Sequence, residues 1–291
     1  MVRNAHDLAG LICGHYLRIG LGHIRIIDDG SSDGTCRLLS DLARKEKRIS
    51  LHRVDNTEFH QARLMSEAAN ELILAGFSLI LPFDVDEFWD VSGPALEKRY
   101  ADRSEIAFTG RRTNFVHSAA ATRARRCYLL GVKYSAPILA DATPDMIMTY
   151  KRPWVCAPMP SKVGFKSARA VELDKGQHRL IVGPTEIDDH PYEVFHLPLR
   201  SKSELMKRAV DREPRVAPLR SHPSSGWQST FHHQAALAGR IDEVWLANSA
   251  DVNGFLNCHG QPIALRRDIR LRTLILKSYA YVALRYGMLL P

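Results

Sequence analysis

The stretch that decides the fold runs from Ser78 to Trp89 and reads SLILPFDVDEFW, an apolar run that ends in acids. The apolar part is long enough for one buried strand and far too short to span a membrane. Asp84 and Asp86 close the run, and Glu87 stands beside them. Carboxylates resist burial without a counter-charge, so the run predicts a site at the carboxyl end of a strand, where open α/β sheets bind ligands.

A hard divalent cation is the natural counter-charge for such acids, held by one or two carboxylates and by the phosphates of a substrate. A D-x-D pair on its spacing alone is more often a solvated strand end than a metal site. The pattern therefore leaves both interpretations open until other parts of the sequence are considered.

The residues before this run alternate between strand and helix patterns. Apolar residues at helical spacing predict helices, and alternating or short apolar runs predict strands. The expected order is a helix over 8–21, a strand over 23–27, a helix over 36–47, a strand over 49–54, a helix over 61–75 and a strand over 79–83. This order predicts a mostly parallel α/β sheet. Such a sheet normally begins with a strand, and 1–3 are only its stub, which indicates a late start codon or a truncated chain.

Composition places the chain among ordinary globular proteins. Its 291 residues suffice for one large domain or a domain with an appendage, and 45% of them are hydrophobic. The formal charge of +8 favours polyanionic ligands or an acidic surface. Basic runs interleaved with aromatic residues are absent, so we do not expect a nucleic-acid partner. Scattered cysteines, the lack of a signal peptide and the lack of a spanning run predict a cytoplasmic protein, peripheral at most to the inner face of the membrane.

Five motifs occur in one order along residues 1 to about 210. They are Met1-Val2-Arg3-Asn4, then DDGSSDGT at 28–35, FDVDEF at 83–88, GQH at 176–178 and FHLPLRS at 195–201. Together they resemble the family 2 glycosyltransferases, and in particular a bacterial branch with the patterns M-V-[KR]-N-E, D-N/D-G-S-x-D-G-T and L-D-x-D-E-F. Each motif is weak alone, whereas five in order are specific.

The resemblance implies a GT-A fold over residues 1–210, which is a Rossmann-like nucleotide-binding mixed sheet flanked by helices. Residues 211–291 are expected to form a C-terminal extension, a loop followed by helices. The implied activity is the transfer of a sugar, with inversion, from a UDP- or GDP-sugar to a hydroxyl of a saccharide or lipid-linked acceptor, in polysaccharide or glycoconjugate assembly. The implied cofactor is Mn²⁺ or Mg²⁺.

The resemblance also assigns the donor site. Asn4, Asp28 and Asp29 correspond to positions around the base and ribose, and Asp84 and Asp86 correspond to residues that hold the ribose and the metal. His196 is assigned as a third metal ligand because many GT-A enzymes use a late histidine in this way. The sequence departs from the branch at Ala5, where the branch has Glu, and in its short first strand.

Diphosphate contacts are assigned to Arg63 and Lys162, and catalytic roles to His178 and Glu87. His178 is expected to act as general base on the acceptor hydroxyl because its unperturbed pKa lies near working pH. The alternatives stay open: Arg63 fits a solvated helix face equally well, a lone histidine is more often structural, and three carboxylates compete for the role of base, namely Asp174, Asp188 and Asp189.

Two other functions compete with glycosyl transfer. A nucleotidyltransferase also uses paired acids with Mg²⁺, but it needs a glycine-rich basic loop near the first strand, which the sequence lacks. A catalytically impaired protein that binds nucleotide-sugars would account for Ala5 and the short first strand. The basic helix expected over 265–290 either lies on an anionic membrane surface or packs on the domain.

Overall fold

The computed structural model describes residues 1–54, 60–120, 128–216, 227–258 and 261–288, and its first part is built as the strand and helix patterns predict. β1 pairs in parallel with β2, from Ile24 opposite Ile49 to Asp29 opposite Val54. Asp33 accepts a hydrogen bond from the backbone N–H of Thr35, the first residue of α2. The elements of this part are α1 (His6–Arg18), β1 (Ile24–Asp29), α2 (Thr35–Lys45), β2 (Ile49–Val54) and α3 (Gln61–Leu74).

A mixed sheet of seven strands forms the centre of the molecule. Its order is β13-β6-β5-β10-β4, and β7 pairs with both β5 and β3. Only the pair of β5 and β10 is parallel in this sheet. Its strands are β3 (Leu79–Ile80), β4 (Glu87–Asp90), β5 (Ile106–Val116), β6 (Tyr134–Ser135), β7 (Lys162–Lys166), β10 (Ile187–His196) and β13 (Arg266–Arg267).

The prediction of a mostly parallel sheet is therefore wrong, although the α/β class is confirmed. Parallel strands need long crossover connections, and after α3 the chain places few helices between its strands. The strand expected over 79–83 is also shorter, since only Leu79 and Ile80 join the ladder, against β7. Pro82 has no N–H to offer a ladder, which agrees with the early end of this strand.

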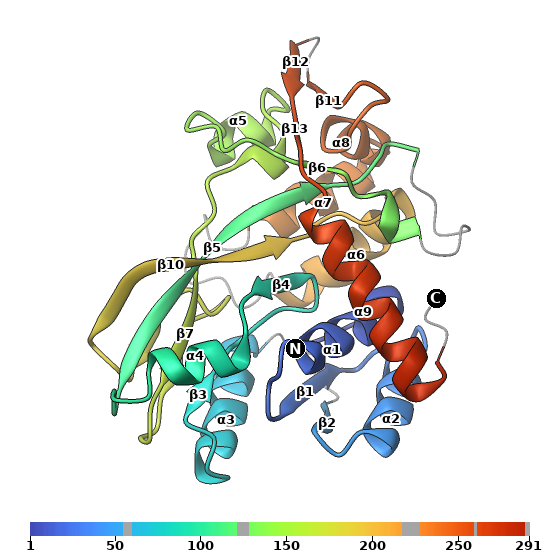
Figure 1. Cartoon of the computed structure of the whole chain (residues 1–291). Helices are drawn as coiled ribbons and strands as arrows, with labels where there is room; N and C mark the ends of the chain where they lie inside the picture. Colours follow the sequence, from blue (N-terminus) through green and yellow to red (C-terminus); the bar gives the residue numbers. More distant parts are fainter. Residues whose placement is uncertain (55–59, 121–127, 217–226, 259–260, 289–291) are drawn as a thin grey trace.

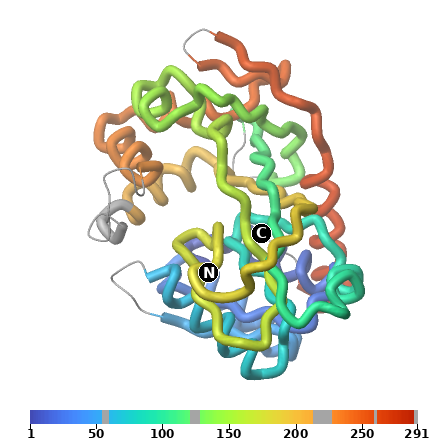
Figure 2. Tube along the Cα trace, turned by 90° about the vertical axis from the view of Figure 1, so that its left-hand side faces the viewer, coloured from blue at the N-terminus to red at the C-terminus, as the bar shows by residue number. Residues whose placement is uncertain are grey.

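β5 and β10 extend through most of the molecule and join its lower part, with α1 to α4, to its upper part, with α5, α7 and α8 (Figures 1 and 2). The largest apolar core lies where α1, α2 and α9 pack on β1, β4 and β5, and a second core fills the upper part. The remaining elements are α4 (Gly93–Arg99), η1 (Tyr128–Gly131), α5 (Pro144–Met148), η2 (Trp154–Cys156), β8 (Glu172–Leu173), β9 (Leu180–Val182), α6 (Lys202–Val216), α7 (Trp227–Leu237), α8 (Ile241–Ala247), β11 (Phe255–Cys258), β12 (Gln261–Ala264) and α9 (Arg270–Tyr286).

The C-terminal helix α9 packs directly on α1. Gly14 makes this close crossing feasible, because a Cβ at this position would lie 2.6 Å from Cγ2 of Val282 and 2.9 Å from the carbonyl oxygen of Ser278. The extension therefore shares the core of the N-terminal part. Its expected first residue, 211, falls inside α6, and the loop expected next lies mostly in 217–226, outside the described residues.

No helix within the described ranges is long and apolar enough to cross a membrane.

Candidate functional site

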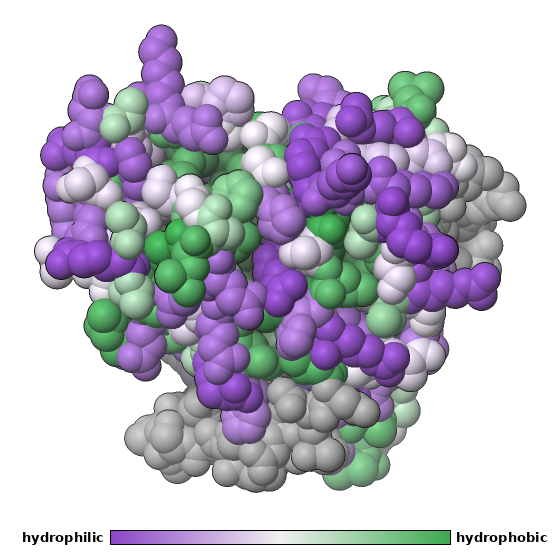
Figure 3. Space-filling model, turned by 90° about the horizontal axis from the view of Figure 1, so that it is seen from below, coloured by the Kyte–Doolittle hydropathy of each residue, from purple (hydrophilic) through white to green (hydrophobic). Residues whose placement is uncertain are grey.

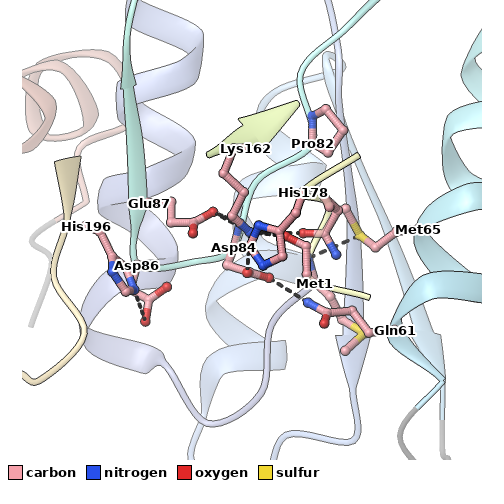
Figure 4. A network of polar contacts seen from close by, with 12 residues as sticks. Met1, Gln61, Met65, Pro82, Asp84, Asp86, Glu87, Lys162, His178 and His196 are labelled. Carbon is pink, nitrogen blue, oxygen red and sulfur yellow. Dashed lines mark hydrogen bonds and ion pairs between the residues drawn. The ribbon is translucent and has the colours of Figure 1, made fainter. Parts of the chain in front are cut away.

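The ends of several strands meet at one polar site (Figure 4). The β4–β10 ladder places Glu87 opposite His196, and the β10–β5 ladder places His196 opposite Asn114. Asp84, Glu87 and Lys162 point toward one another, while Asp86 and His196 form a second group to one side. The site thus consists of a buried ion cluster and a neighbouring pair.

The ion cluster has Lys162 at its centre. Nζ of Lys162 lies 2.8 Å from Oδ2 of Asp84 and 2.8 Å from Oε2 of Glu87, and its side chain is fully buried. Arg112 adds a second positive charge, with Nη1 3.4 Å from Oε1 of Glu87. Two acids and two bases balance one another, which is the condition for keeping such charges inside a protein.

The charges of the cluster hold one another ionised. Burial alone would lower the pKa of Lys162, but Asp84 and Glu87 outweigh burial and raise that pKa above its ordinary value. Burial alone would raise the pKa of Asp84, but the charges of Lys162 and of the Met1 amine outweigh it and lower that pKa. Gln61 donates to the other oxygen of Asp84 at 2.8 Å, so both carboxylate oxygens have partners.

This arrangement bears on two of the expected roles. Nζ of Lys162 also donates to the carbonyl oxygen of Gly176 at 2.7 Å, so its hydrogen-bonding capacity is used within the protein. Glu87 is 1% exposed, and its carboxylate oxygens contact Lys162, Arg112 and the backbone N–H of Asp84. The positions favour structural roles for Lys162 and Glu87 over the diphosphate contact and the catalytic role expected of them.

Asp86 and His196 form the pair beside the cluster, with Nε2 of His196 3.8 Å from Oδ2 of Asp86. The amide of Asn114 is oriented by its donation to the carbonyl oxygen of Val155, so Oδ1 of Asn114 must accept from Nδ1 of His196, 2.8 Å away. Burial lowers the pKa of His196 although Asp86 and Glu87 act to raise it, so the ring is neutral near pH 7. Its Nε2 then carries an electron pair on the side of Asp86.

A carboxylate oxygen beside an imidazole nitrogen is a donor pair that suits Mn²⁺ better than Mg²⁺, which prefers oxygen ligands alone. In the described ranges no group of three or more His, Cys, Asp and Glu side chains could hold a metal ion. Asp84 turns toward Lys162 and Gln61 instead of joining Asp86 and His196 (Figure 4). The residues present thus fit a cation held by two protein side chains and otherwise by ligand phosphates or water.

Helix α6 brings arginines to the same place. Nη1 of Arg208 lies 3.8 Å from Oδ2 of Asp86, and the charge of Arg212, one turn further along, helps to lower the pKa of Asp84. The sequence interpretation missed both residues. Their spacing of four residues on a helix that follows the FHLPLRS motif is the signal that could have identified them.

The carboxylate of Asp28 lies at the end of β1, fully buried, and neither of its oxygens has a hydrogen-bond partner among the described residues. A buried carboxylate without a partner is unfavourable, so this position is suited to a donor supplied by a ligand. Asp29 follows it and is also buried. Asn4 holds the loop after them, because its Oδ1 accepts from the backbone N–H of Ser32 at 2.8 Å.

Met1 connects the two acidic regions, since the charges of Asp84 and Asp29 both act on its amine. Partial burial lowers the pKa of the amine, although the charges of Asp84, Glu87 and Asp29 act to raise it. The amine donates to Sδ of Met65 at 3.7 Å. The end of β1 and the D-x-D acids thus both lie close enough to the first residue for their charges to act on it.

His178 lies in a tight turn beside the cluster, with Nδ1 3.1 Å from the carbonyl oxygen of Ser161. If Nδ1 donates there, Nε2 is free to accept a proton. Burial lowers the pKa of His178, as do the charges of Lys162 and Arg112. The preceding residue, Gln177, is fully buried at a φ of 55°, and its Nε2 has no partner among the described residues, a second feature that the sequence did not reveal.

The other expected residues lie elsewhere or have structural partners. Arg63 is exposed and pairs with Glu67 at 2.8 Å on α3, as expected of a solvated helix face. Asp174 accepts from the backbone N–H of His178 at 2.7 Å, and Asp188 bonds to Arg99 and Tyr100. Asp189 is exposed. Among the described residues, we observe no contact of Asp188 or Asp189 with the polar site. Asp174 is connected to the site only through the turn that carries His178.

Comparison with protein-family models and with curated proteins yields no match to this sequence.

Proposed function

We propose that this chain is a glycosyltransferase of the GT-A type, which moves a sugar from a nucleotide-sugar to a hydroxyl acceptor. The observation that carries the proposal is the pair of Asp86 and His196, a carboxylate oxygen and a neutral ring nitrogen 3.8 Å apart beside a strand end. These two side chains would hold Mn²⁺ or Mg²⁺. The cation, when bound, supplies Lewis-acid stabilisation of the negative charge that develops on the leaving diphosphate.

The side chains around this pair have matching roles. Arg208 and Arg212 of α6 offer positive charge to the same diphosphate. Asp28 has buried acceptor oxygens without partners among the described residues, and these oxygens suit an N–H donor on the nucleotide base. Asp84 is 29% exposed at its side chain and can accept a ribose hydroxyl in addition to its present partners.

His178 is the proposed general base. Its Nε2 takes the proton of the acceptor hydroxyl while the oxygen forms a bond to the anomeric carbon of the sugar. The bond from that carbon to the diphosphate breaks, and the nucleoside diphosphate leaves with the electron pair. A depressed pKa keeps the ring of His178 neutral and ready to accept a proton near pH 7.

A protein that binds nucleotide-sugars without turnover is the second candidate. It is favoured by one observation, the amine of Met1, on which the charges of both Asp84 and Asp29 act. A positive charge there competes with hydroxyl and N–H donors of a ligand for the same carboxylates. The two candidates differ in turnover and share the same binding site.

The proposed acceptor is a saccharide or a lipid-linked saccharide. The proposed reaction belongs to polysaccharide or glycoconjugate assembly at the cytoplasmic face of a membrane. The outer surface of α9 exposes the cations Arg272 and Lys277 beside the apolar side chains Leu276 and Leu284. Cations with apolar neighbours suit peripheral contact with an anionic lipid surface.

A thermal-shift screen of UDP-, GDP-, CDP- and dTDP-sugars, with and without Mn²⁺, tests the proposed donor site. We expect a metal-dependent rise in Tm for one nucleotide, and loss of that rise in Asp86→Asn and His196→Ala. Matched controls are Asp90→Asn on β4 and His190→Ala on β10, both exposed positions. A metal-dependent shift that persists in Asp86→Asn would overturn the site assignment, and binding without sugar release would favour the second candidate.

A further inference from the structure

Glu204, in the first turn of α6, has a buried carboxylate that is only half paired. Its Oε1 lies 2.8 Å from Nη2 of Arg200, whereas its Oε2 has no hydrogen-bond partner among the described residues. Apolar side chains between polar ones at the surface, as in the view of the molecule from below, are ordinary (Figure 3). A buried carboxylate oxygen without a partner is rare and unfavourable, so it needs an explanation.

Glu204 is held in place by two other buried side chains. Arg200 contacts Glu204 and also donates from Nη1 to Oδ1 of Asp7 on α1, at 3.0 Å. The side chains of all three residues are at most 7% exposed. Because this network fixes the carboxylate, a partner for its Oε2 has to come from a side chain that can move toward it.

Arg208 lies one turn further along α6 and approaches two acids without a close contact to either. Its Nε is 3.7 Å from Oε1 of Glu204, and its Nη1 is 3.8 Å from Oδ2 of Asp86. Both distances are longer than an N–H···O hydrogen bond. Among the described residues, the guanidinium makes one hydrogen bond, from Nη2 to the carbonyl oxygen of Pro198. A base four residues after an acid on a helix is well placed to pair with it, and the side chain of Arg208 is 23% exposed, so it can change its rotamer.

The oxygen of Asp86 that faces Arg208 is the same one that faces His196. Oδ2 of Asp86 lies 3.8 Å from Nη1 of Arg208 and 3.8 Å from Nε2 of His196. A cation bound by Asp86 and His196 would therefore meet the positive charge of Arg208 at close range. Like charges repel one another strongly in a partly buried site, so Arg208 in this position opposes a cation.

We propose that Arg208 makes the binding of a cation at Asp86 and His196 depend on a diphosphate ligand. While Arg208 faces Asp86, it supplies the counter-charge of that carboxylate and opposes a cation. With a diphosphate, the guanidinium moves to Glu204, where it pairs with Oε2 and directs its remaining N–H groups to the phosphate oxygens. The inference rests on the proposed function, whose cation site it deepens by assigning the residue that couples the cation to the diphosphate.

Binding of Mn²⁺ alone to the full chain, followed by electron paramagnetic resonance, tests the inference. Arg208→Gln removes the opposing charge and should tighten Mn²⁺ binding by at least about fivefold. Arg208→Lys keeps the charge and should bind Mn²⁺ as weakly as the unaltered protein does. Lys207→Gln removes an exposed charge from the neighbouring position of α6 and is the matched control. A merely structural role for Arg208 would leave Mn²⁺ binding unchanged or weakened in Arg208→Gln, which would overturn the inference.

Glu204→Gln tests the second position of Arg208. Loss of the negative charge at Glu204 leaves Arg208 with Asp86, so Mn²⁺ alone should bind more weakly in this variant, opposite to the effect of Arg208→Gln. Tighter or equal Mn²⁺ binding in Glu204→Gln would contradict the movement of Arg208 to Glu204. Because Glu204 also pairs with Arg200, its variant is checked by thermal unfolding, and if it does not fold, the two Arg208 variants decide the inference.

Asp86→Asn separates this inference from the proposed function. If Asp86→Asn does not weaken Mn²⁺ binding, the cation site is wrong and both proposals fail. If it weakens Mn²⁺ binding but Arg208→Gln does not tighten it, only the inference about Arg208 is overturned. Mn²⁺ binding that stays undetectable at millimolar concentrations in both the unaltered protein and Arg208→Gln also overturns the inference, while metal-dependent binding of a nucleotide-sugar still decides the proposed function.

Discussion

Nδ1 of His196 lies 2.8 Å from Oδ1 of Asn114, and this contact directs the opposite ring nitrogen toward Asp86. The two residues are directly opposite one another in the β10–β5 ladder, so the backbone pairing itself brings them together. Partners of this kind orient a metal-binding histidine and select its tautomer.

Asn114→Ala should therefore weaken Mn²⁺ binding by about 10- to 100-fold while Asp86 and His196 stay in place. Titration of Mn²⁺ followed by electron paramagnetic resonance, with and without a nucleotide-sugar, measures the effect. Asn257→Ala, at an exposed position on β11, serves as the control. Equal Mn²⁺ affinity in Asn114→Ala and the unaltered protein would contradict the proposed orienting role.

Lys162→Met should destabilise the protein by about 3–5 kcal/mol, because Asp84 and Glu87 would be left without their shared buried counter-charge. Urea unfolding measures the change, and Lys98→Met at an exposed position should alter stability little. The double variant with Glu87→Gln should lose less than the sum of the two single variants, since they share one interaction. Strictly additive losses would show that the contacts of Lys162 and Glu87 are energetically independent.

Asp28→Asn should change stability and binding in opposite directions. Removing a buried carboxylate that has no partner among the described residues should raise the free energy of unfolding by about 1 kcal/mol or more. The same change removes an acceptor oxygen and should weaken nucleotide binding, measured by calorimetry. Asp102→Asn, at an exposed position, should affect neither property. If Asp28→Asn were less stable than the unaltered protein, this would contradict the view that a ligand supplies the hydrogen-bond donor for Asp28.

Glu46 should make the attachment of α9 sensitive to acid. Hydrogen bonds from Arg48 and then from Tyr286 lower the pKa of Glu46 to about 2, against the effect of burial. A carboxyl whose pKa is lowered by folding stabilises the fold above its unfolded pKa, and that contribution is lost as pH falls from about 4.5 towards 2. Tm of Glu46→Gln should lie below that of the unaltered protein at pH 7, and the difference should shrink toward pH 2.5.

Thermal unfolding over this pH range, with Glu97→Gln as an exposed control, measures the effect of Glu46. A difference in Tm that is constant with pH would show that Glu46 acts through packing instead of through its charge.

Sequence patterns predicted the first part of the fold within a few residues, because its helices and strands have local signals. The helix expected over 61–75 is α3 at Gln61–Leu74, and the strand expected over 49–54 is β2 at Ile49–Val54. The later sheet was not predictable in the same way. β5 pairs with β7, β6 and β10, and strand pairing between distant segments leaves little trace in the local sequence.

The candidate site was predictable in part, for a related reason. Asp86 and His196 were chosen from separate motifs, and the structure places their side chains together, while their roles stay predictions. Lys162 and Glu87 were also chosen, but they neutralise one another in the interior. A charged residue in a motif looks the same in the sequence whether its partner is a ligand or another side chain.

The continuity of β5 and β10 has a consequence for motion. A hinge between two halves of a protein normally uses a few loop residues that absorb changes in backbone angle. Here Arg112 and Asn114, which hold the ion cluster and His196, are carried by a strand that continues beyond them to Val116 and β6. Opening the molecule at the site would require bending this paired ribbon, so ligands should enter through movements of side chains and loops around a stiff centre.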